Sequence, residues 1–380
     1  MKLFNVYHLL DVEIVRAQGS TLWDKNGKEY LDFYGGHAVI SIGHTNPRYV
    51  KAINDQLSKI GFYSNSVVIS AQEELAELLG QLSGKKDYQL FMCNSGAEAN
   101  ENALKLASFH TGRRKVIAFS GSFHGRTSLA VAATDNPKIV APINETPNVI
   151  FSKFNDVEAL RELFDQNGDQ IAAVITEGIQ GVGGVQEASP EFLRAIRELT
   201  SRHGALYIAD SVQCGCGRSG SYFSHDWAGV DADIYTMAKG IANGFPLGAL
   251  LISPSIKPAF GMLGTTFGGN HLACAAAKAV AREMLDYKLI ENAKQMGDYL
   301  LFELKKLASN KIKEIRGRGL MIGIEFNEDC TPIRSALLKK HSIFVGSAAN
   351  ACVIRLLPTL NITKKECDLV LLALKSELFT

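Results

Sequence analysis

Short apolar runs alternate with helical segments through the middle of the chain, and this alternation limits the possible folds more than any other feature. The runs are rich in β-branched and other apolar residues and are bounded by glycine or polar residues, which is typical of buried strands. They are KVIAFSG (115–121), AAVITEG (172–178), GALYIAD (204–210) and GALLIS (248–253). Helical segments are expected at 98–110 and 189–204. Alternating strands and helices predict an α/β fold with a mostly parallel sheet.

The helical segment at 189–204 shows its own start and stop signals. Phe192 and Ile196 recur at helical spacing, Ser189 suits the N-cap, Pro190 suits the first turn and Gly204 suits the end. These signals predict a helix that packs one apolar face against the sheet.

The pattern changes after residue 275. A long helical region precedes strand candidates at 319–326 and 352–358, and the chain ends in a further helix. This order predicts a second, smaller α+β domain.

Length and charge narrow the class of protein. A chain of 380 residues with 46% hydrophobic residues can bury roughly three quarters of its unfolded surface. A formal net charge of +1 gives no electrostatic reason to expect nucleic acid or an anionic membrane as a partner. The chain has no uncharged apolar run of about 18 residues, and its N-terminal stretch does not read as a secretory signal.

The cysteines point to a reducing compartment. Seven are scattered along the chain, and the close pair Cys214 and Cys216 lacks the spacing and the second ligand pair of a zinc site. We therefore expect free thiols, no metal and a cytoplasmic location.

The stretch NSGAEAN indicates an anion site at the start of a helix. Ser95 and Glu98 have the spacing of a capping box, and the small residues Gly96 and Ala97 let their N–H groups approach a ligand closely. Free N–H groups at a helix N-terminus attract anions.

Polar residues follow several of the predicted strands at their carboxyl ends, the edge at which open α/β sheets bind ligands. Asp210 and Glu177 each end a strand, and Gln213 follows Asp210 closely. Other candidates after a strand or before a tight turn are Phe123, His124, Arg126, Thr265 and Thr266.

Lys239 stands in the apolar, glycine-rich stretch IYTMAKGIANGFPLGALLIS. A buried ammonium is costly unless it is paired, neutralised or consumed in a covalent bond. Taken alone, each of these features has an ordinary explanation, such as a capped helix, a core aromatic or a lysine whose head reaches water. Together they supply the parts that would hold pyridoxal phosphate (PLP): a phosphate cradle, an acid for the ring nitrogen, an aromatic plate and a lysine for the aldehyde.

The chain resembles the class III PLP-dependent aminotransferases and is most similar to the acylornithine aminotransferases of arginine metabolism. The resemblance runs from TLWDKNGKEYLDFYGGHAVISIGHTNP (21–47) through NSGAEAN, SFHGRT, DSVQ and AKG to TTFGGN. It implies the PLP-dependent transferase fold type I and a homodimer with active sites at the subunit interface. It also implies a small-domain segment at 1–45, a large PLP-binding domain at 46–275 and the rest of the small domain at 276–380.

The resemblance also implies a role for individual residues. Lys239 is expected to form the Schiff base with PLP, and Asp210 to pair with the pyridine nitrogen. The cofactor-binding residues expected besides these are Ser95, Gly96, Ala97, Phe123, Glu177, Gln213 and, from the neighbouring subunit, Thr266. The substrate-binding residues expected are Arg126, Thr265, Arg355 and Tyr7.

The expected reaction moves the δ-amino group of an N-acylornithine to 2-oxoglutarate, which leaves as glutamate. Several positions depart from the family pattern: Gly178 replaces proline, Val182 replaces the second glutamate, Ser211 replaces glutamate and His271 replaces proline. In ornithine-type relatives the glutamate at the position of Val182 can pair with the arginine that matches Arg355. A valine cannot form this pair, so N-succinylornithine is a candidate substrate beside N-acetylornithine.

Two other interpretations fit the same residues. One is a class III enzyme that acts on free ornithine, 4-aminobutyrate or a related ω-amine. The other is an inactive protein of this fold that serves as a binding subunit, although intact Lys239, Asp210, Arg126 and Thr266 argue against it.

Overall fold

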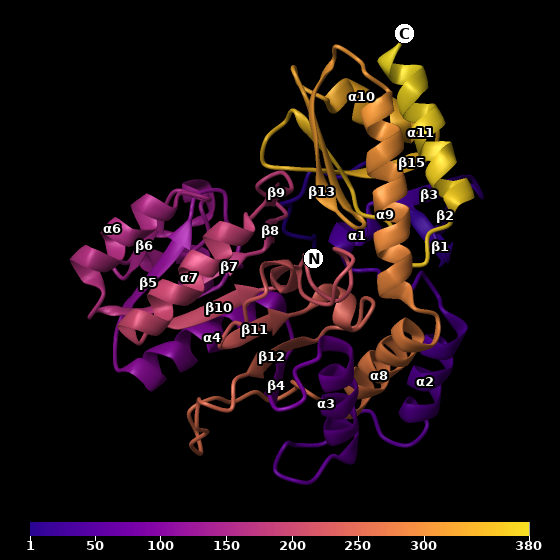
Figure 1. The fold of residues 1–380 in the computed structure, drawn as a ribbon. Coiled ribbons are helices and arrows are strands. Elements are labelled where there is room, and N and C mark those ends of the chain that lie inside the picture. The colour runs from indigo at the N-terminus through magenta and orange to yellow at the C-terminus, as the bar shows by residue number, and fades with distance from the viewer. Residues whose placement is uncertain (380) are drawn as a thin grey trace.

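The computed structural model describes residues 1–379. Within these residues it has two seven-stranded sheets and a two-stranded ribbon formed by β8 (Ile179–Gln180) and β9 (Gln186–Glu187). Figure 1 shows the first large sheet beside helices α4, α6 and α7, and the second beside the C-terminal helices.

The first sheet has the strand order β4-β12-β11-β10-β7-β5-β6. Its strands are β4 (Gln89–Cys93), β5 (Lys115–Phe119), β6 (Val149–Ser152), β7 (Ile171–Glu177), β10 (Leu206–Asp210), β11 (Ile234–Met237) and β12 (Gly248–Ile252). Neighbours from β11 to β6 pair in parallel, whereas β12 is antiparallel to both β11 and β4. The predicted mostly parallel α/β sheet is therefore confirmed.

Helices cover both faces of this sheet. Helix α4 (Gly96–Thr111) packs on one face, and α6 (Val157–Asn167) and α7 (Pro190–His203) pack on the other. Burial on both faces explains why strands such as β7 and β10 are buried along their whole length and read as continuous apolar runs.

Helix α7 begins and ends as its sequence predicts. The Ser189 hydroxyl accepts a hydrogen bond from the Phe192 N–H over 3.1 Å, and Pro190 takes the first helical position. Gly204 ends the helix with a φ of 63°, in the left-handed region that favours glycine.

The second sheet joins the two ends of the chain. Its order is β1-β2-β3-β15-β16-β14-β13. Its strands are β1 (Ile14–Gln18), β2 (Thr21–Asp24), β3 (Glu29–Phe33), β13 (Ile312–Arg318), β14 (Met321–Phe326), β15 (Ile343–Ser347) and β16 (Val353–Leu356). Strand β15 pairs in parallel with β3, with Ile343 opposite Leu31. The indigo N-terminal strands and the orange to yellow C-terminal elements consequently lie together in Figure 1.

The long helical region expected after residue 275 forms two helices, α8 (His271–Asp286) and α9 (Leu289–Lys306). They are separated at Lys288, which has a φ of 50° and so cannot continue an α-helix. The other helices are α1 (Gly35–Ala38), α2 (Pro47–Leu57), α3 (Ser70–Ser83), α5 (Ser128–Ala132), α10 (Thr331–Lys339) and α11 (Lys364–Leu378). The short 3₁₀ helices are η1 (Pro137–Ile139), η2 (Pro142–Asn144), η3 (Ser224–Ala228) and η4 (Lys239–Ile241).

None of the helices in residues 1–379 combines the length and the apolar character that crossing a bilayer requires.

Candidate active site

A cavity of about 420 Å³ opens beside the carboxyl ends of β7 and β10. This is the edge at which parallel strands present the loops that follow them. Most of the residues predicted for the site meet here. The predicted residues that line the cavity are Ser95, Gly96, Ala97, Phe123, Arg126, Glu177, Asp210, Gln213 and Lys239.

The N-terminus of α4 forms one end of the cavity. The Ser95 hydroxyl accepts from the Glu98 N–H over 3.1 Å, as the predicted capping box requires, but the Glu98 carboxylate accepts from the N–H of Asn94 over 2.8 Å instead of that of Ser95. Only half of the predicted capping box is therefore present. Within residues 1–379, the N–H groups of Gly96 and Ala97 donate to no protein acceptor. These donors and the helix dipole make this end of the cavity suitable for an anion.

Gly96 is required by close packing. A Cβ atom at this position would lie 2.6 Å from Cγ1 of Val212, a distance that real side chains essentially never show. The backbone at the helix start can therefore stay against the loop after β10 only while residue 96 lacks a side chain.

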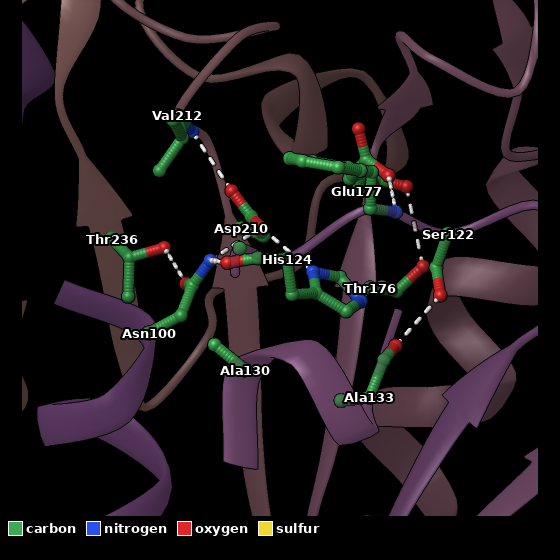
Figure 2. A network of polar contacts seen from close by, with 12 residues as sticks. Asn100, Ser122, His124, Ala130, Ala133, Thr176, Glu177, Asp210, Val212 and Thr236 are labelled. Carbon is green, nitrogen blue, oxygen red and sulfur yellow. Dashed lines mark hydrogen bonds and ion pairs between the residues drawn. The ribbon is translucent and has the colours of Figure 1, made fainter. Parts of the chain in front are cut away.

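Asp210 lies at the end of β10 and is 2% exposed. Its Oδ2 accepts from Nδ1 of His124 over 2.7 Å and from Nδ2 of Asn100 over 2.8 Å. Its Oδ1 accepts from the N–H of Val212 over 2.9 Å. Figure 2 shows these contacts converging on one carboxylate. Three donors stabilise the buried negative charge and orient it.

Glu177 ends the neighbouring strand β7 and joins two cavity-lining loops. Its Oε1 accepts from the N–H of Phe123 over 3.1 Å, and its Oε2 accepts from the N–H of Gly181 over 3.0 Å. Burial, and next the nearby charge of Asp210, raise the pKa of Glu177 to about 7, while His124 and the two N–H donors act in the opposite direction.

Lys239 opens the short helix η4 directly after β11 and faces the cavity. Its φ of 49° lies in the left-handed region, which is uncommon for a residue with a side chain and is often found at functional sites. Among residues 1–379 no acceptor lies within hydrogen-bonding distance of its ammonium. Burial lowers the pKa of Lys239, although the charges of Asp210 and Glu177 oppose this.

Arg355 lies in β16 of the second sheet and reaches Gln213 beside the cavity. Its Nη1 donates to Oε1 of Gln213 over 3.0 Å, and its Nε donates to the carbonyl oxygen of Ser347 over 2.5 Å. Both acceptors are neutral, and within residues 1–379 Arg355 has no carboxylate partner at salt-bridge distance. Val182 lines the cavity at the position where the family pattern has a glutamate.

The single chain does not bring every predicted residue to the cavity. Thr265 accepts from the N–H of Gly268 over 3.0 Å and Thr266 is exposed, but neither lines the cavity. Tyr7 is 78% exposed and lies in the N-terminal segment before β1. The roles expected of these three residues remain predictions.

Two further polar residues contact Asp210, and the sequence pattern alone predicts no role for either. His124 and Asn100 both donate to Asp210, and Asn100 Oδ1 accepts from the Thr236 hydroxyl over 2.6 Å. A signal for Asn100 is present in the sequence, because it lies one helical turn after Gly96 and therefore on the same face of α4. Nothing local in the sequence indicates that Thr236 is its partner.

The donors and acceptors of the cavity fit PLP. The free N–H groups at the start of α4 suit a phosphate, and the buried carboxylate of Asp210 suits a protonated ring nitrogen. Phe123 supplies an apolar wall, and Lys239 supplies an amine without a protein partner. Within residues 1–379, no group of three or more His, Cys, Asp or Glu side chains is arranged to hold a metal ion.

Comparisons with known proteins agree with this chemistry. The family model described as Aminotransferase class-III matches residues 5–378. An acetylornithine aminotransferase from Bacillus anthracis is 39% identical over 383 residues, covering 100% of this chain and 97% of the relative. The acetylornithine aminotransferase of Bacillus subtilis is 41% identical over 368 residues, covering 96% and 94%.

Solved structures show the same arrangement of the chain. The ornithine aminotransferase of Toxoplasma gondii superposes with a TM-score of 0.91 at 29% identity, covering 98% of this chain and 91% of that one. The acetylornithine aminotransferase of Elizabethkingia anophelis gives a TM-score of 0.85 at 30% identity, covering 98% and 95%. Because the family model spans nearly the whole chain and the site fits the cofactor, this protein belongs to the class III aminotransferases, which depend on pyridoxal phosphate.

Proposed function

We propose that this enzyme transfers the δ-amino group of an N-acylornithine to 2-oxoglutarate, in arginine biosynthesis. The observation that carries the proposal is the unpaired amine of Lys239 in a cavity that also holds Asp210 and free helix N–H groups. The full-length similarity to proteins named acetylornithine aminotransferase supports the choice of substrate class. When bound, PLP supplies a carbonyl that amines attack and a ring that withdraws electrons from the substrate carbon.

Different residues are placed to hold different parts of this cofactor. The N–H groups of Gly96 and Ala97 would bind the phosphate, with Ser95 beside them. Asp210 would accept from the protonated ring nitrogen, and Phe123 would pack against the ring. Gly96 and Ala97 open α4, Asp210 ends β10 and Phe123 lies in the loop after β5, so elements at one edge of the sheet present all of these groups to the cavity.

Lys239 is the residue placed to transfer the proton of the substrate carbon. Burial lowers the pKa of Lys239, which favours the neutral form of the amine that a proton acceptor requires. With PLP bound, Nζ of Lys239 would accept the proton of the substrate carbon and would then donate it to a carbon of the cofactor. The expected kinetics are ping-pong, because both half-reactions share one site.

Two arginines are available for the carboxylates of the substrates. Arg126 is exposed at the cavity and has no hydrogen-bonding or ionic partner within residues 1–379. Arg355 is held by the neutral acceptors Gln213 and Ser347, so a carboxylate that displaces them leaves no buried charge unpaired. Because Arg355 has no carboxylate partner within residues 1–379, it suits a second carboxylate, and N-succinylornithine is therefore proposed as a substrate beside N-acetylornithine.

The test compares kcat/KM for N-acetylornithine, N-succinylornithine, free ornithine and 4-aminobutyrate with 2-oxoglutarate as acceptor. We expect kcat/KM to be higher for both acylornithines than for free ornithine and 4-aminobutyrate. V182E is expected to lower succinylornithine use more than acetylornithine use, because the new carboxylate pairs with Arg355. A clear preference of the wild type for the acetyl compound contradicts the succinyl proposal, and a preference for free ornithine or 4-aminobutyrate contradicts the acylornithine assignment.

We also propose a cytoplasmic homodimer, with the domain division at residues 45/46 and 275/276. A second subunit would account for Thr266, which is exposed in the single chain, and would cover exposed apolar side chains such as Phe62 and Phe267. Mixing K239A with T266A is expected to give more activity than either variant shows alone, since mixed dimers contain one site with both residues intact. Light scattering that reports a monomer would contradict this proposal.

A further inference from the structure

Asp210 is linked through Asn100 to the strand that precedes the reactive lysine. Thr236 lies in β11 directly opposite Asp210 in the parallel register, and Lys239 follows it by three residues. The Thr236 hydroxyl donates to Oδ1 of Asn100 over 2.6 Å, and Asn100 Nδ2 donates to Asp210 over 2.8 Å. Figure 2 shows Thr236, Asn100 and Asp210 in this order.

The polarity of this chain of bonds is fixed. Asn100 Nδ2 also donates to the backbone carbonyl of His124 over 2.7 Å, so its amide nitrogen faces two acceptors, a carboxylate and a carbonyl. Turning the amide over would place its oxygen against both of them. Thr236 provides the donor that the amide oxygen needs in the observed orientation.

The three residues of this hydrogen-bond chain are buried. Asp210 is 2% exposed, Asn100 is 1% exposed and Thr236 is fully buried. Inside a protein, hydrogen bonds of this kind are strengthened, and a buried polar group left without a partner is costly. Removing the Thr236 hydroxyl therefore leaves the Asn100 oxygen unsatisfied and weakens the preference of the amide for its present orientation.

Helix α4 also joins these hydrogen bonds to the end of the cavity that suits a phosphate. Gly96 and Asn100 are four residues apart and share a helix face. One helix therefore carries both the N–H donors that suit an anion and the Asn100 amide that donates to Asp210. The helix fixes the distance between these N–H groups and the amide.

We propose that Asn100 and Thr236 are positioning residues that aim the Asp210 carboxylate at the ring nitrogen of the cofactor. They act through Asp210 and contact neither ring nor substrate. The inference rests on the use of PLP and not on which acylornithine is the substrate.

The experiment measures binding of PLP to the apoenzyme and the pH at which the visible absorption band of the bound cofactor titrates. T236V keeps the shape of the side chain and removes the hydroxyl, whereas T236S keeps the hydroxyl. T200V is the matched control, because Thr200 is also fully buried but donates to the Ile196 carbonyl within α7. Thermal unfolding of each apoenzyme monitors the fold.

T236V is expected to bind PLP about tenfold more weakly and to shift the spectral titration, because the misaligned carboxylate holds the protonated ring nitrogen less well. T236S should return both values to within about twofold of the wild type, and T200V should leave both unchanged. Should T236V fail to fold, N100L is measured in the same way and is expected to show the same spectral shift.

The proposal is overturned when T236V or N100L binds PLP like the wild type with an unchanged titration. It is also overturned when T236S is impaired as strongly as T236V, since packing and not the hydroxyl would then be responsible. These measurements need no substrate, so their failure is distinguishable from failure of the proposed acylornithine activity.

Discussion

Glu177 and Asp210 are opposite each other in the register of the parallel strands β7 and β10, and both line the same cavity. Two carboxylates at neighbouring strand ends repel each other, and these two differ in the hydrogen-bond donors that surround them. Asp210 accepts from two side-chain donors and one N–H, whereas Glu177 accepts from two backbone N–H groups alone. Burial and the charge of Asp210 raise the pKa of Glu177 to about 7, so Glu177 takes up a proton at a higher pH than an ordinary glutamate does.

The raised pKa of Glu177 predicts a pH-dependent stability of the apoenzyme. A carboxyl group whose folded pKa lies above its unfolded value stabilises the fold below the unfolded pKa and loses this contribution as the pH rises through the folded pKa. Between about pH 4.5 and 7 the wild type should therefore lose stability relative to E177Q, by about 3 kcal/mol at most. Chemical denaturation at several pH values measures the difference. The exposed variant E162Q should follow the wild type, and parallel curves for E177Q and wild type would contradict the prediction.

Lys239 is predicted to be the point of covalent attachment. Borohydride reduction of the loaded enzyme should fix the cofactor on the peptide that contains Lys239, as mass spectrometry can detect, and K239A should carry no such label. Activity of K239A should fall on the order of a thousandfold or more, because the variant also lacks the proton carrier. K153A is the control, since Lys153 is a surface residue that pairs with Asp156. A label that persists in K239A would refute the assignment.

Gly96 is predicted to be essential because of its contact with Val212. G96A places a methyl group where Val212 already lies, which costs about 1–3 kcal/mol unless the helix start moves away from the anion site. PLP affinity of the apoenzyme should drop about tenfold or more. The double variant G96A/V212A should recover part of this loss by making room. Without any recovery, the steric explanation fails.

Arg126 is predicted to bind a substrate carboxylate. R126M should lower kcat/KM on the order of a hundredfold, chiefly through KM, because a charge-assisted hydrogen bond to the carboxylate is lost. Binding of PLP to the apoenzyme should not change. R161M serves as the matched control, because Arg161 pairs with Glu158 on the surface of α6. An unchanged KM for both the amino donor and 2-oxoglutarate in R126M would exclude this role.

Local features of the fold were readable from the chain alone. The strands of the first sheet, the cap and the end of α7, and the free N–H groups at the start of α4 depend on residues within a few positions of one another. Their spacing therefore carries the information. The same holds for the candidate residues at strand ends, because a strand and the loop after it are consecutive in sequence.

What the chain alone determined is the set of chemical groups and the elements that carry them: a lysine in an apolar, glycine-rich stretch, an acid at a strand end and a helix start with small residues suited to an anion. Only the tertiary structure decided their partners. Asn100 meets Asp210 and Thr236, Arg355 meets Gln213, and the Glu98 carboxylate turns to Asn94. The physical reason is that hydrogen-bonding groups far apart in sequence find each other only when packing of the whole core brings their elements together, and no local spacing records that choice.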